Sequence, residues 1–300
     1  MLKNNLLYTG AKKRDFVHKI TNFILRKILH KRSNDHLLHY GQPVIFAFDY
    51  VSNEINIDGV YEIDDLNILI EWISLKAPEI FEGEFIDIGA NIGNHSLFFS
   101  NYFNRVFSFE PNPRTYQVLT INAQLRNNIY CFQAAISDSN INAFLSQERS
   151  NMGGSFVSMT PSKSSVPIVL SRLDQYADNF RNIKLIKFDV EGHEYNSILG
   201  SKSIIKKYRP IIIFEQHKFD FEAKENKVIN LLSTYNYKTF AIIVRSNCKS
   251  NSLLLRIGSK ILSGSSKSIV ICDELIPDFY PFIIAIPEGH KIISEFSNNI

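Results

Sequence analysis

Cysteine is scarce in this chain, and its three copies lie far apart. Cys131, Cys248 and Cys272 form no Cys-x-x-Cys pair and have no clustered histidines beside them. Neither a disulfide framework nor a zinc site is indicated, because three separated thiols supply neither paired bridges nor a four-ligand site. The pattern favours a reducing, cytoplasmic setting.

Long apolar runs and an excess of one charge are also missing. No stretch approaches the roughly 18 uninterrupted apolar residues of a membrane span, and the first residues lead into no signal-peptide apolar region. The 33 basic and 30 acidic residues nearly balance at a formal charge of +3, so no nucleic-acid partner is indicated. With 45% hydrophobic content in 300 residues, the chain can bury one sizeable core, and we expect a soluble protein.

The most basic segment, residues 11–32, has the pattern of an amphipathic helix. Most such helices cover the core of their own domain, so we expect this one to lie on the protein with its basic face in solvent. The alternative is weak contact with a membrane surface, or docking on a partner. The apolar residues at helical spacing are Phe16, Ile20, Phe23, Ile24 and Ile28, and the basic residues around them are Lys12, Lys13, Arg14, Lys19, Arg26, Lys27, Lys31 and Arg32.

The first 80 residues form an N-terminal extension of their own. Residues 43–60 combine β-rich runs with a turn signal at Ser52 and Asn53, which predicts a β-hairpin. Residues 62–76 have helical periodicity with Trp72 on the apolar face. We therefore predict a helical and β-hairpin extension over residues 1–80, which caps the substrate site, and a main domain over residues 81–300.

From residue 84 onward, short apolar runs alternate with helical stretches. This alternation is typical of βαβ units and of a parallel, doubly wound sheet with helices on both faces. A polar stretch, 138–165, interrupts it and is predicted to be a long loop or a hairpin insertion, and residues 246–268 are predicted to be irregular. The expected elements are FIDIG (85–89), a helix at 93–102, RVFSFE (105–110), a helix at 113–126, IYCFQAA (129–135), KLIKFDV (184–190), a helix at 194–206, PIIIFE (210–215), a helix at 222–235, YKTFAIIV (237–244) and FIIAIP (282–287).

A glycine-containing turn follows the first of these strands. The sequence reads Asp-Ile-Gly-Ala-Asn-Ile-Gly over residues 87–93, so the strand ends in a turn and a helix starts near Asn91. Glycine there allows a ligand to approach the backbone. Glu110 ends the second strand 21 positions after Gly89, close to the roughly 20-residue spacing of an acid that binds ribose hydroxyls. An adenosine-bearing ligand is therefore implied.

The glycine pattern also selects among such ligands. It is G-x-x-x-G, and it lacks the G-x-G-x-x-G arrangement that cradles a pyrophosphate at a helix N-terminus. A nucleoside without phosphates fits better. The alternative is that Gly89 and Gly93 only permit tight packing of a strand against a helix.

Six blocks extend this pattern over residues 81–218, and in their order and spacing the chain resembles the FkbM family of S-adenosylmethionine-dependent methyltransferases. The resemblance implies a Rossmann-like class I methyltransferase fold, with a mainly parallel seven-stranded sheet, a last antiparallel hairpin and helices on both faces. It implies S-adenosyl-L-methionine as cofactor and a methyl transfer to a hydroxyl of a carbohydrate or other small molecule. It does not reach residues 1–60 or 246–280. The blocks are FIDIGANIGNHS (85–96), FSFEPNP (107–113), AAISD (134–138), SRLDQY (171–176), IKFDVEGHEYNSILG (186–200) and RPIIIFEQH (209–217).

The resemblance also implies which residues hold the cofactor. The turn after the first strand would contact the methionine end, the acid after the second strand the ribose, and the residues past the third strand the adenine edge. An aspartate after a strand is also commonly a turn residue, and both interpretations stay open for Asp138. The implied set is Asp87, Gly89, Ala90, Asn91 and Gly93 for methionine, Glu110 for ribose, and Ala135, Ser137 and Asp138 for adenine.

Acids and histidines follow the fourth and fifth strands, where an open α/β sheet binds its ligands. Methyl transfer to a hydroxyl needs an oriented oxygen and a base for its proton. We assign orientation or proton acceptance to Asp189, Glu191 and His217, since histidine ordinarily changes charge near neutral pH. The alternative is that the acids only favour the positive end of a helix dipole. With Glu215 these groups could hold a divalent ion, but no ligand spacing demands one, and we predict no metal.

Two other functions remain alternatives to methyl transfer. One is a nicotinamide-dependent oxidoreductase, which the missing third glycine disfavours. The other is a module without activity that binds an adenosyl ligand in a glycan assembly complex, with the basic helix as its docking element. The sequence leaves open the identity of the acceptor, the methylated position and the oligomeric state.

Overall fold

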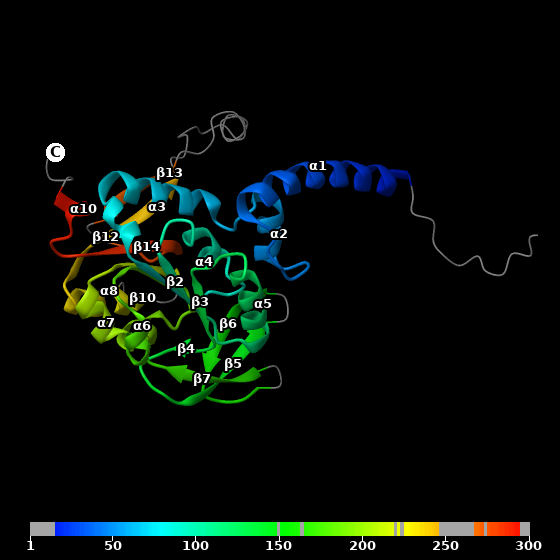
Figure 1. The fold of residues 1–300 in the computed structure, drawn as a ribbon. Helices are drawn as coiled ribbons and strands as arrows, with labels where there is room; N and C mark the ends of the chain where they lie inside the picture. Colours follow the sequence, from blue (N-terminus) through cyan, green and yellow to red (C-terminus); the bar gives the residue numbers. More distant parts are fainter. Residues whose placement is uncertain are drawn as a thin grey trace, which may run out of the picture.

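A single large sheet forms the centre of the molecule (Figure 1). The computed structural model describes residues 16–148, 151–162, 165–218, 221–222, 225–245, 267–272 and 275–294. The order of the strands is β13-β12-β14-β9-β8-β1-β2-β3. Their bounds are β1 Glu84–Ile88, β2 Arg105–Phe109, β3 Ile129–Phe132, β8 Ile183–Phe188, β9 Ile211–Gln216, β12 Tyr237–Arg245, β13 Lys267–Cys272 and β14 Tyr280–Pro287.

The strand directions confirm the predicted fold class. Strands β1, β2, β3, β8 and β9 pair in parallel, β14 is antiparallel to both of its neighbours, and β13 is antiparallel to β12. From β1 the chain first builds outward to β3 and then returns to β8 on the other side. The strand order thus reverses between β1 and β8, which is where open sheets of this kind bind ligands. The sheet has one strand more than predicted. The additional strand is β13, and the segment before it, 246–266, lies outside the described residues.

Helices cover both faces of the sheet because its strands alternate apolar side chains between the two sides. In β1, Phe85 packs on one face, while Ile86 and Ile88 pack on the other. The first face is covered by α3 Ile63–Lys76, η1 Pro78–Glu82, α4 Asn94–Phe99 and α10 Lys291–Ser294. The second face is covered by η2 Leu173–Asn179, α6 Glu194–Leu199, α7 Lys202–Tyr208 and α8 Lys227–Thr234, and α5 Pro113–Ala123 flanks β3.

The polar stretch 138–165 is more ordered than a loop. It contributes to a second sheet in the order β4-β7-β5-β6, with a small apolar core that includes Ala143, Leu145 and Ile168. The many serines in this stretch obscure the alternation of apolar and polar residues that would have predicted strands. The strands are β4 Ala135–Ile136, β5 Asn142–Glu148, β6 Asn151–Ser158 and β7 Ser165–Ser171.

The helices predicted at 93–102 and 113–126 are shorter in the structure, and two others are divided or displaced. The helix expected at 194–206 is divided into α6 and α7 at Gly200, whose backbone packs so closely that a Cβ there would lie 1.8 Å from the carbonyl oxygen of Ser137. The helix expected at 222–235 shortens to α8, because the short strands β10 Phe221–Glu222 and β11 Glu225–Asn226 precede it.

The β-hairpin predicted within residues 43–60 is wrong, because the structure has a helix there, α2 Tyr50–Asp58. The Asp49 side chain caps its start by accepting a hydrogen bond from the backbone N–H of Ser52. Gly59, at φ +85°, ends it with a backbone bond to Ile55. These caps outweigh the alternation of apolar residues that suggested strands. The helix expected at 62–76 is confirmed as α3, with Trp72 partly buried against the core.

The basic segment forms α1, Phe16–Tyr40, which projects away from the rest of the molecule (Figure 1). None of its residues is buried, so the expectation that it lies on its own domain is wrong for residues 16–31. Residues 11–15 of the predicted helix lie outside the described part of the chain. Within that part, no helix has both the length and the apolar character to span a bilayer.

Candidate active site

The turn after β1 brings the backbone of the first site residues to the carboxyl end of the sheet. Gly89 and Ala90 both donate their N–H groups to the carbonyl of Phe109 at the end of β2, at 3.0 Å. Gly89 has φ +83°, and a Cβ there would lie 1.7 Å from the carbonyl oxygen of Asp189. Glycine is therefore required for packing between β1 and the segment after β8, whatever ligand binds above it.

Glu110 follows β2 and is held rigidly beside this turn. Its Oε2 accepts the N–H of Asn91 at 3.0 Å, and its Oε1 accepts the N–H of Asn112 at 2.8 Å. Burial raises the pKa of Glu110 to about 7, although these two backbone hydrogen bonds favour the ionised form and oppose the rise. Each carboxylate oxygen keeps a further lone pair for a hydroxyl donor.

A row of buried polar side chains crosses the same end of the sheet. Ser108, Asp87 and Lys187 are in register on three neighbouring strands. Ser96 of α4 donates to Oδ2 of Asp87 at 2.6 Å, and Lys187 donates to Oδ2 of Asp189 at 2.6 Å. The other oxygen of Asp87, Oδ1, is buried and has no hydrogen-bond partner within the described residues. Because a buried acceptor without a partner is costly, Oδ1 fits a donor that a ligand supplies.

Lys187 sets the charge of the neighbouring acids. Burial alone would raise the pKa of Asp189, but the adjacent Lys187 ammonium outweighs it and lowers that pKa. Burial, and after it the charges of Asp189 and Glu191, raise the pKa of Glu215 well above its usual range. The two carboxyl groups share a hydrogen bond. Near neutral pH we therefore assign a negative charge to Asp189 and a proton to Glu215. The carboxyl group of Glu215 then donates the shared hydrogen bond to Asp189.

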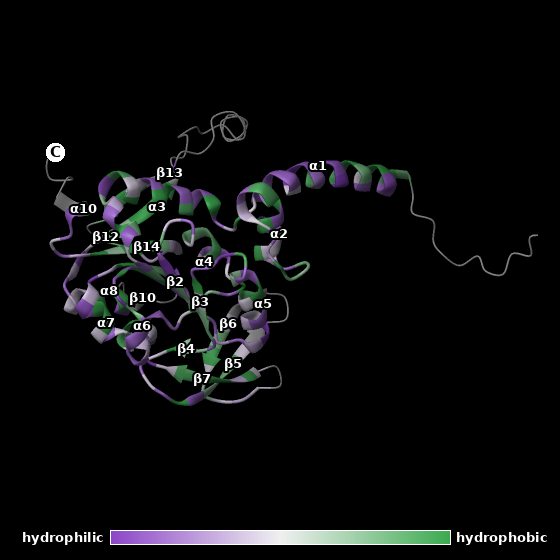
Figure 2. Ribbon diagram, viewed as in Figure 1, coloured by the Kyte–Doolittle hydropathy of each residue, from purple (hydrophilic) through white to green (hydrophobic). Residues whose placement is uncertain are grey.

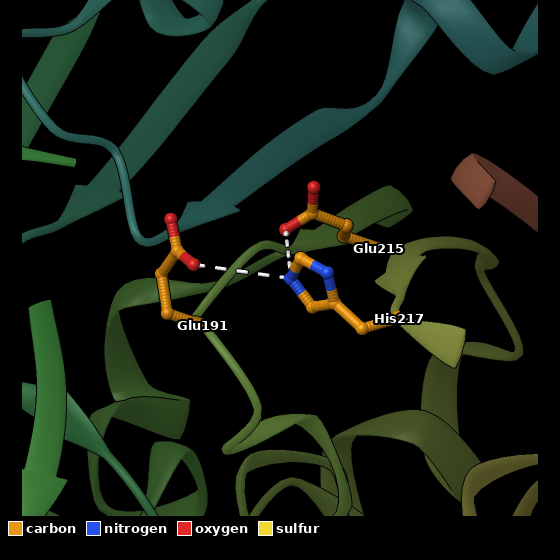
Figure 3. A group of neighbouring side chains, drawn as sticks. All are labelled: Glu191, Glu215 and His217. Atoms are coloured by element: carbon orange, nitrogen blue, oxygen red, sulfur yellow. Dashed lines mark ion pairs between the residues drawn. The ribbon is translucent and has the colours of Figure 1, made fainter. Parts of the chain in front are cut away.

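Glu191, Glu215 and His217 converge from the ends of two strands (Figure 3). Nε2 of His217 lies 3.5 Å from Oε2 of Glu215 and 3.9 Å from Oε2 of Glu191. Glu191 has φ +53° in the turn after β8, and His217 follows β9, with its ring centroid 5.2 Å from that of Phe279. One ligand atom from each of the three residues lies within 4.8 Å of the others, so this group has the spacing to bind a divalent cation as well as to move a proton.

A cavity joins these groups. Its open volume is about 1260 Å³ when the space at its mouth is included. Of the predicted site residues, it is lined by Gly89, Ala90, Asn91, Glu110, Ala135, Asp189 and Glu191. The others lie outside the lining: Asp87, Gly93, Ser137, Asp138 and His217. Asp87 lies beneath the turn in the polar row, and His217 adjoins the lining through Glu191 and Glu215.

The predicted adenine side consists of a hydrogen-bonded network and an apolar wall. Ser137 is buried; its Oγ lies 2.9 Å from Nε2 of His193 and donates to Asp138 at 3.2 Å. Burial lowers the pKa of His193, which keeps this histidine neutral. Leu145 and Val157 of the second sheet line the cavity here. Sequence analysis missed both, because the strands that carry them were expected to be a loop.

The opposite wall comes from the N-terminal extension, which the sequence could not connect to the site. Tyr50, Tyr61 and Glu62 line the cavity together with His95 of α4. The rings of Tyr61 and His95 stack at 6.3 Å, and Nε2 of His95 lies 3.3 Å from Oε2 of Glu62. Burial, followed by the charge of Glu62, raises the pKa of Tyr61, so its hydroxyl stays protonated. Asn94 fixes the position of Tyr61 by bonding its backbone N–H and carbonyl at 3.0 and 3.1 Å.

Comparison with known proteins shows which family the chain belongs to. The family model described as the methyltransferase FkbM domain matches residues 87–239, which is half of the chain. The chain belongs to this family. The hexuronic acid methyltransferase AglP of Haloferax volcanii is 27% identical over 162 residues, which cover 53% of this chain and 66% of that protein. The match thus spans just under two thirds of the relative's length.

Two of the solved structures to which the chain is similar are methyltransferases. The methyltransferase FkbM from Methylobacillus flagellatus KT has a TM-score of 0.36 at 20% identity, over 52% of this chain and 36% of that chain. The magnesium protoporphyrin IX methyltransferase ChlM from Synechocystis PCC 6803, with bound S-adenosylmethionine, has a TM-score of 0.40 at 10% identity, over 94% of this chain and all of that one.

Family membership gives the chain a methyltransferase domain, for which S-adenosyl-L-methionine is the predicted cofactor, and disfavours the oxidoreductase alternative. The residues present fit this cofactor. Glu110 presents fixed acceptors suited to two ribose hydroxyls, and Gly89, Ala90 and Asn91 line the same cavity. No glycine-rich pyrophosphate cradle is needed, because the cofactor carries no phosphate.

Proposed function

We propose that this FkbM-family protein transfers a methyl group from S-adenosylmethionine to a hydroxyl of a carbohydrate. One observation carries the proposal: Glu191 and Glu215 line the same cavity as the turn at Gly89 and as Glu110. His217, which lies beside both acids, is therefore close to the residues assigned to the cofactor. The name of the relative AglP, a hexuronic acid methyltransferase, supports a sugar acceptor.

His217 is the proton acceptor in this proposal. When bound, S-adenosylmethionine supplies an electrophilic methyl carbon on a sulfonium. As the methyl group passes to its oxygen, the acceptor hydroxyl would lose its proton to Nε2 of His217. Oε2 of Glu191 and Oε2 of Glu215 lie 3.9 and 3.5 Å from this same nitrogen, where the carboxylate of Glu191 stabilises the positive charge that forms on the ring.

Asp189 and Lys187 hold a neighbouring side chain in place and do not accept the proton. Asp189 is engaged by Lys187 at 2.6 Å and by the hydrogen bond with Glu215, and its lowered pKa makes it a weak base. The pair holds Glu215 beside His217. Asp189, predicted from the sequence to orient the substrate or act as base, is in this proposal a positioning residue.

The N-terminal extension supplies the acceptor side of the cavity. Tyr50 and Tyr61 present aromatic rings whose centroids are 6.1 Å apart, and Glu62 adds a carboxylate. Aromatic faces pack on the apolar faces of sugar rings, and carboxylates accept hydrogen bonds from sugar hydroxyls. We therefore assign residues 50–62 to acceptor binding, which retains the predicted cap.

A transfer assay with a labelled methyl group tests the proposed function. We expect label from S-adenosylmethionine to appear as an O-methyl ether when the protein is offered nucleotide sugars, lipid-linked glycans, free uronic acids and polyols in turn. Tyr61→Ala should raise the apparent Michaelis constant of the sugar while leaving cofactor affinity unchanged, and Leu75→Ala, in an exposed position on α3, serves as the control. Cofactor binding without transfer to any hydroxyl would contradict the proposal and favour the module without activity.

A further inference from the structure

The first half of α1 presents large apolar side chains to solvent. The exposed fractions are 75% for Phe16, 71% for Val17, 63% for Phe23 and 50% for Ile24. Hydropathy colouring shows apolar and polar residues interleaved along the whole helix (Figure 2). Exposed apolar side chains in such a group mark an interaction surface more often than a solvated one.

The second half of α1 attaches the helix to the body. Arg32 donates from Nη1 to the carbonyl of Ile57 at 2.6 Å and lies 3.5 Å from the carboxylate of Asp58. The Nε2 atom of His36 lies 3.0 Å from the same carbonyl. Both contacts reach α2, so α1 is fixed at its carboxyl half while its amino half projects from the body (Figure 1).

The charges on α1 identify the kind of partner. The helix carries Lys19, Arg26, Lys27, Lys31 and Arg32 but a single acid, Asp35, which lies in the attached half. The ammonium of Lys27 lies 5.9 Å from the ring centroid of Phe23, so basic and apolar groups share one surface. A second copy of α1 would bring like charges together without compensating acids. An anionic bilayer complements both features, because acyl chains accept the apolar groups and headgroup phosphates accept the basic ones.

We propose that the amino half of α1, residues 16–31, docks the protein on an anionic lipid surface. Its apolar side chains enter the boundary between headgroups and acyl chains, and its lysines and arginine extend to the phosphates. The sequence directly before α1 adds Lys12, Lys13 and Arg14 to the same end. This inference is independent of the proposed methyl transfer.

Sedimentation of the full-length protein with vesicles tests the docking. We expect it to sediment with vesicles that contain phosphatidylglycerol and to stay in solution with phosphatidylcholine alone. Raising the salt from about 0.1 M to about 1 M shortens the Debye length from roughly 10 to roughly 3 Å and should weaken binding at least tenfold. Equal binding to neutral vesicles, or no binding to anionic ones, would overturn the proposal.

Matched variants assign the binding to α1. Phe16→Ser/Phe23→Ser/Ile24→Ser and Lys19→Gln/Arg26→Gln/Lys27→Gln should each lose binding at least tenfold. The control Leu75→Ser/Ile276→Ser removes apolar groups of similar exposure, 72% and 66%, from the body and should bind like the wild type. S-adenosylmethionine affinity should be the same in all four proteins, because the replaced side chains lie outside the cavity.

Insertion has a spectroscopic signature that does not depend on loss of binding. Phe23→Trp adds one indole to the single native tryptophan, Trp72. We expect its emission to shift to the blue with anionic vesicles only, while that of the wild type stays constant. If the serine variant instead abolishes a dimer of the wild type seen by ultracentrifugation, the occupant is a second copy and the lipid proposal fails.

Discussion

Glu110 shows how one buried carboxyl group links cofactor binding to pH. Burial raises its pKa to about 7 in the protein without ligand, while ribose hydroxyls that donate to it stabilise the ionised form. Binding therefore lowers the pKa of Glu110 and releases a proton, so affinity should rise as pH increases through about 7 and level off above it. Above that pH the carboxylate is already ionised before the ligand arrives.

Calorimetry of the wild type and of Glu110→Gln between pH 6 and 8.5 measures this effect. We expect the variant to bind about ten- to a hundredfold more weakly, in line with roughly 1.5–3 kcal/mol for a hydrogen bond to a charged group. The cofactor's own amino group titrates in this range in both proteins, so the pH dependence lost in the variant belongs to Glu110. An unchanged affinity in the variant would remove Glu110 from the ribose site.

At the scale of single residues, the sequence predicts which acids lie at the ends of the strands but not their protonation states. Glu110, Glu191 and Glu215 follow strands, and a strand's carboxyl end is readable from its apolar run. Which carboxyl group keeps its proton depends on Lys187. A lysine inside a buried strand, two residues before an aspartate on the same face, is the signal that could have revealed this pair.

At the scale of elements, the turn after β1 requires glycine at position 89, and this requirement can be tested. Gly89→Ala would combine the strain of φ +83° with a Cβ placed 1.7 Å from the carbonyl oxygen of Asp189. Gly289 is a matched control, since it has φ +79° and no heavy atom within 4 Å of an added Cβ. We expect Gly289→Ala to cost about 1–2 kcal/mol of unfolding free energy from backbone strain alone.

Gly89→Ala should cost about 1–3 kcal/mol more than the control, because the end of β1 must move away from β8. Chemical denaturation of both variants measures the difference. Equal losses would show that the close contact with Asp189 relaxes freely. This clash is between two parts of the protein. A bulky substitution at Gly89 therefore disturbs the packing of the fold whether or not the cofactor is bound.

The elements also show where sequence patterns are ambiguous. The β-rich runs and the turn signal at Ser52 and Asn53 predicted a hairpin, but the caps at Asp49 and Gly59 enclose a helix. The strands of the main sheet were recognisable because burial on both faces makes them continuous apolar runs. Those of the second sheet were not, since serines occupy much of residues 146–165.

At the scale of the whole molecule, the cavity is formed by segments that lie far apart in the sequence. Its walls come from the turn at Gly89, the ends of β8 and β9, the second sheet and the N-terminal extension. The resemblance to the FkbM family predicted the first two of these parts. The contribution of Tyr61 and Glu62 depends on packing between segments far apart in sequence, for which no local pattern exists.

The central claim is that His217 accepts the acceptor's proton beside the bound cofactor. The most direct test is the pH dependence of the transfer rate, measured with a labelled methyl group at saturating cofactor, for the wild type, His217→Gln and a control, His30→Gln, on exposed α1. The wild-type and control rates should rise with pH, because only a neutral imidazole accepts a proton. In His217→Gln the rate should fall by roughly 10² to 10⁴ and this rise should vanish, with cofactor affinity unchanged. A near-normal rate with the same pH profile in His217→Gln would contradict the account.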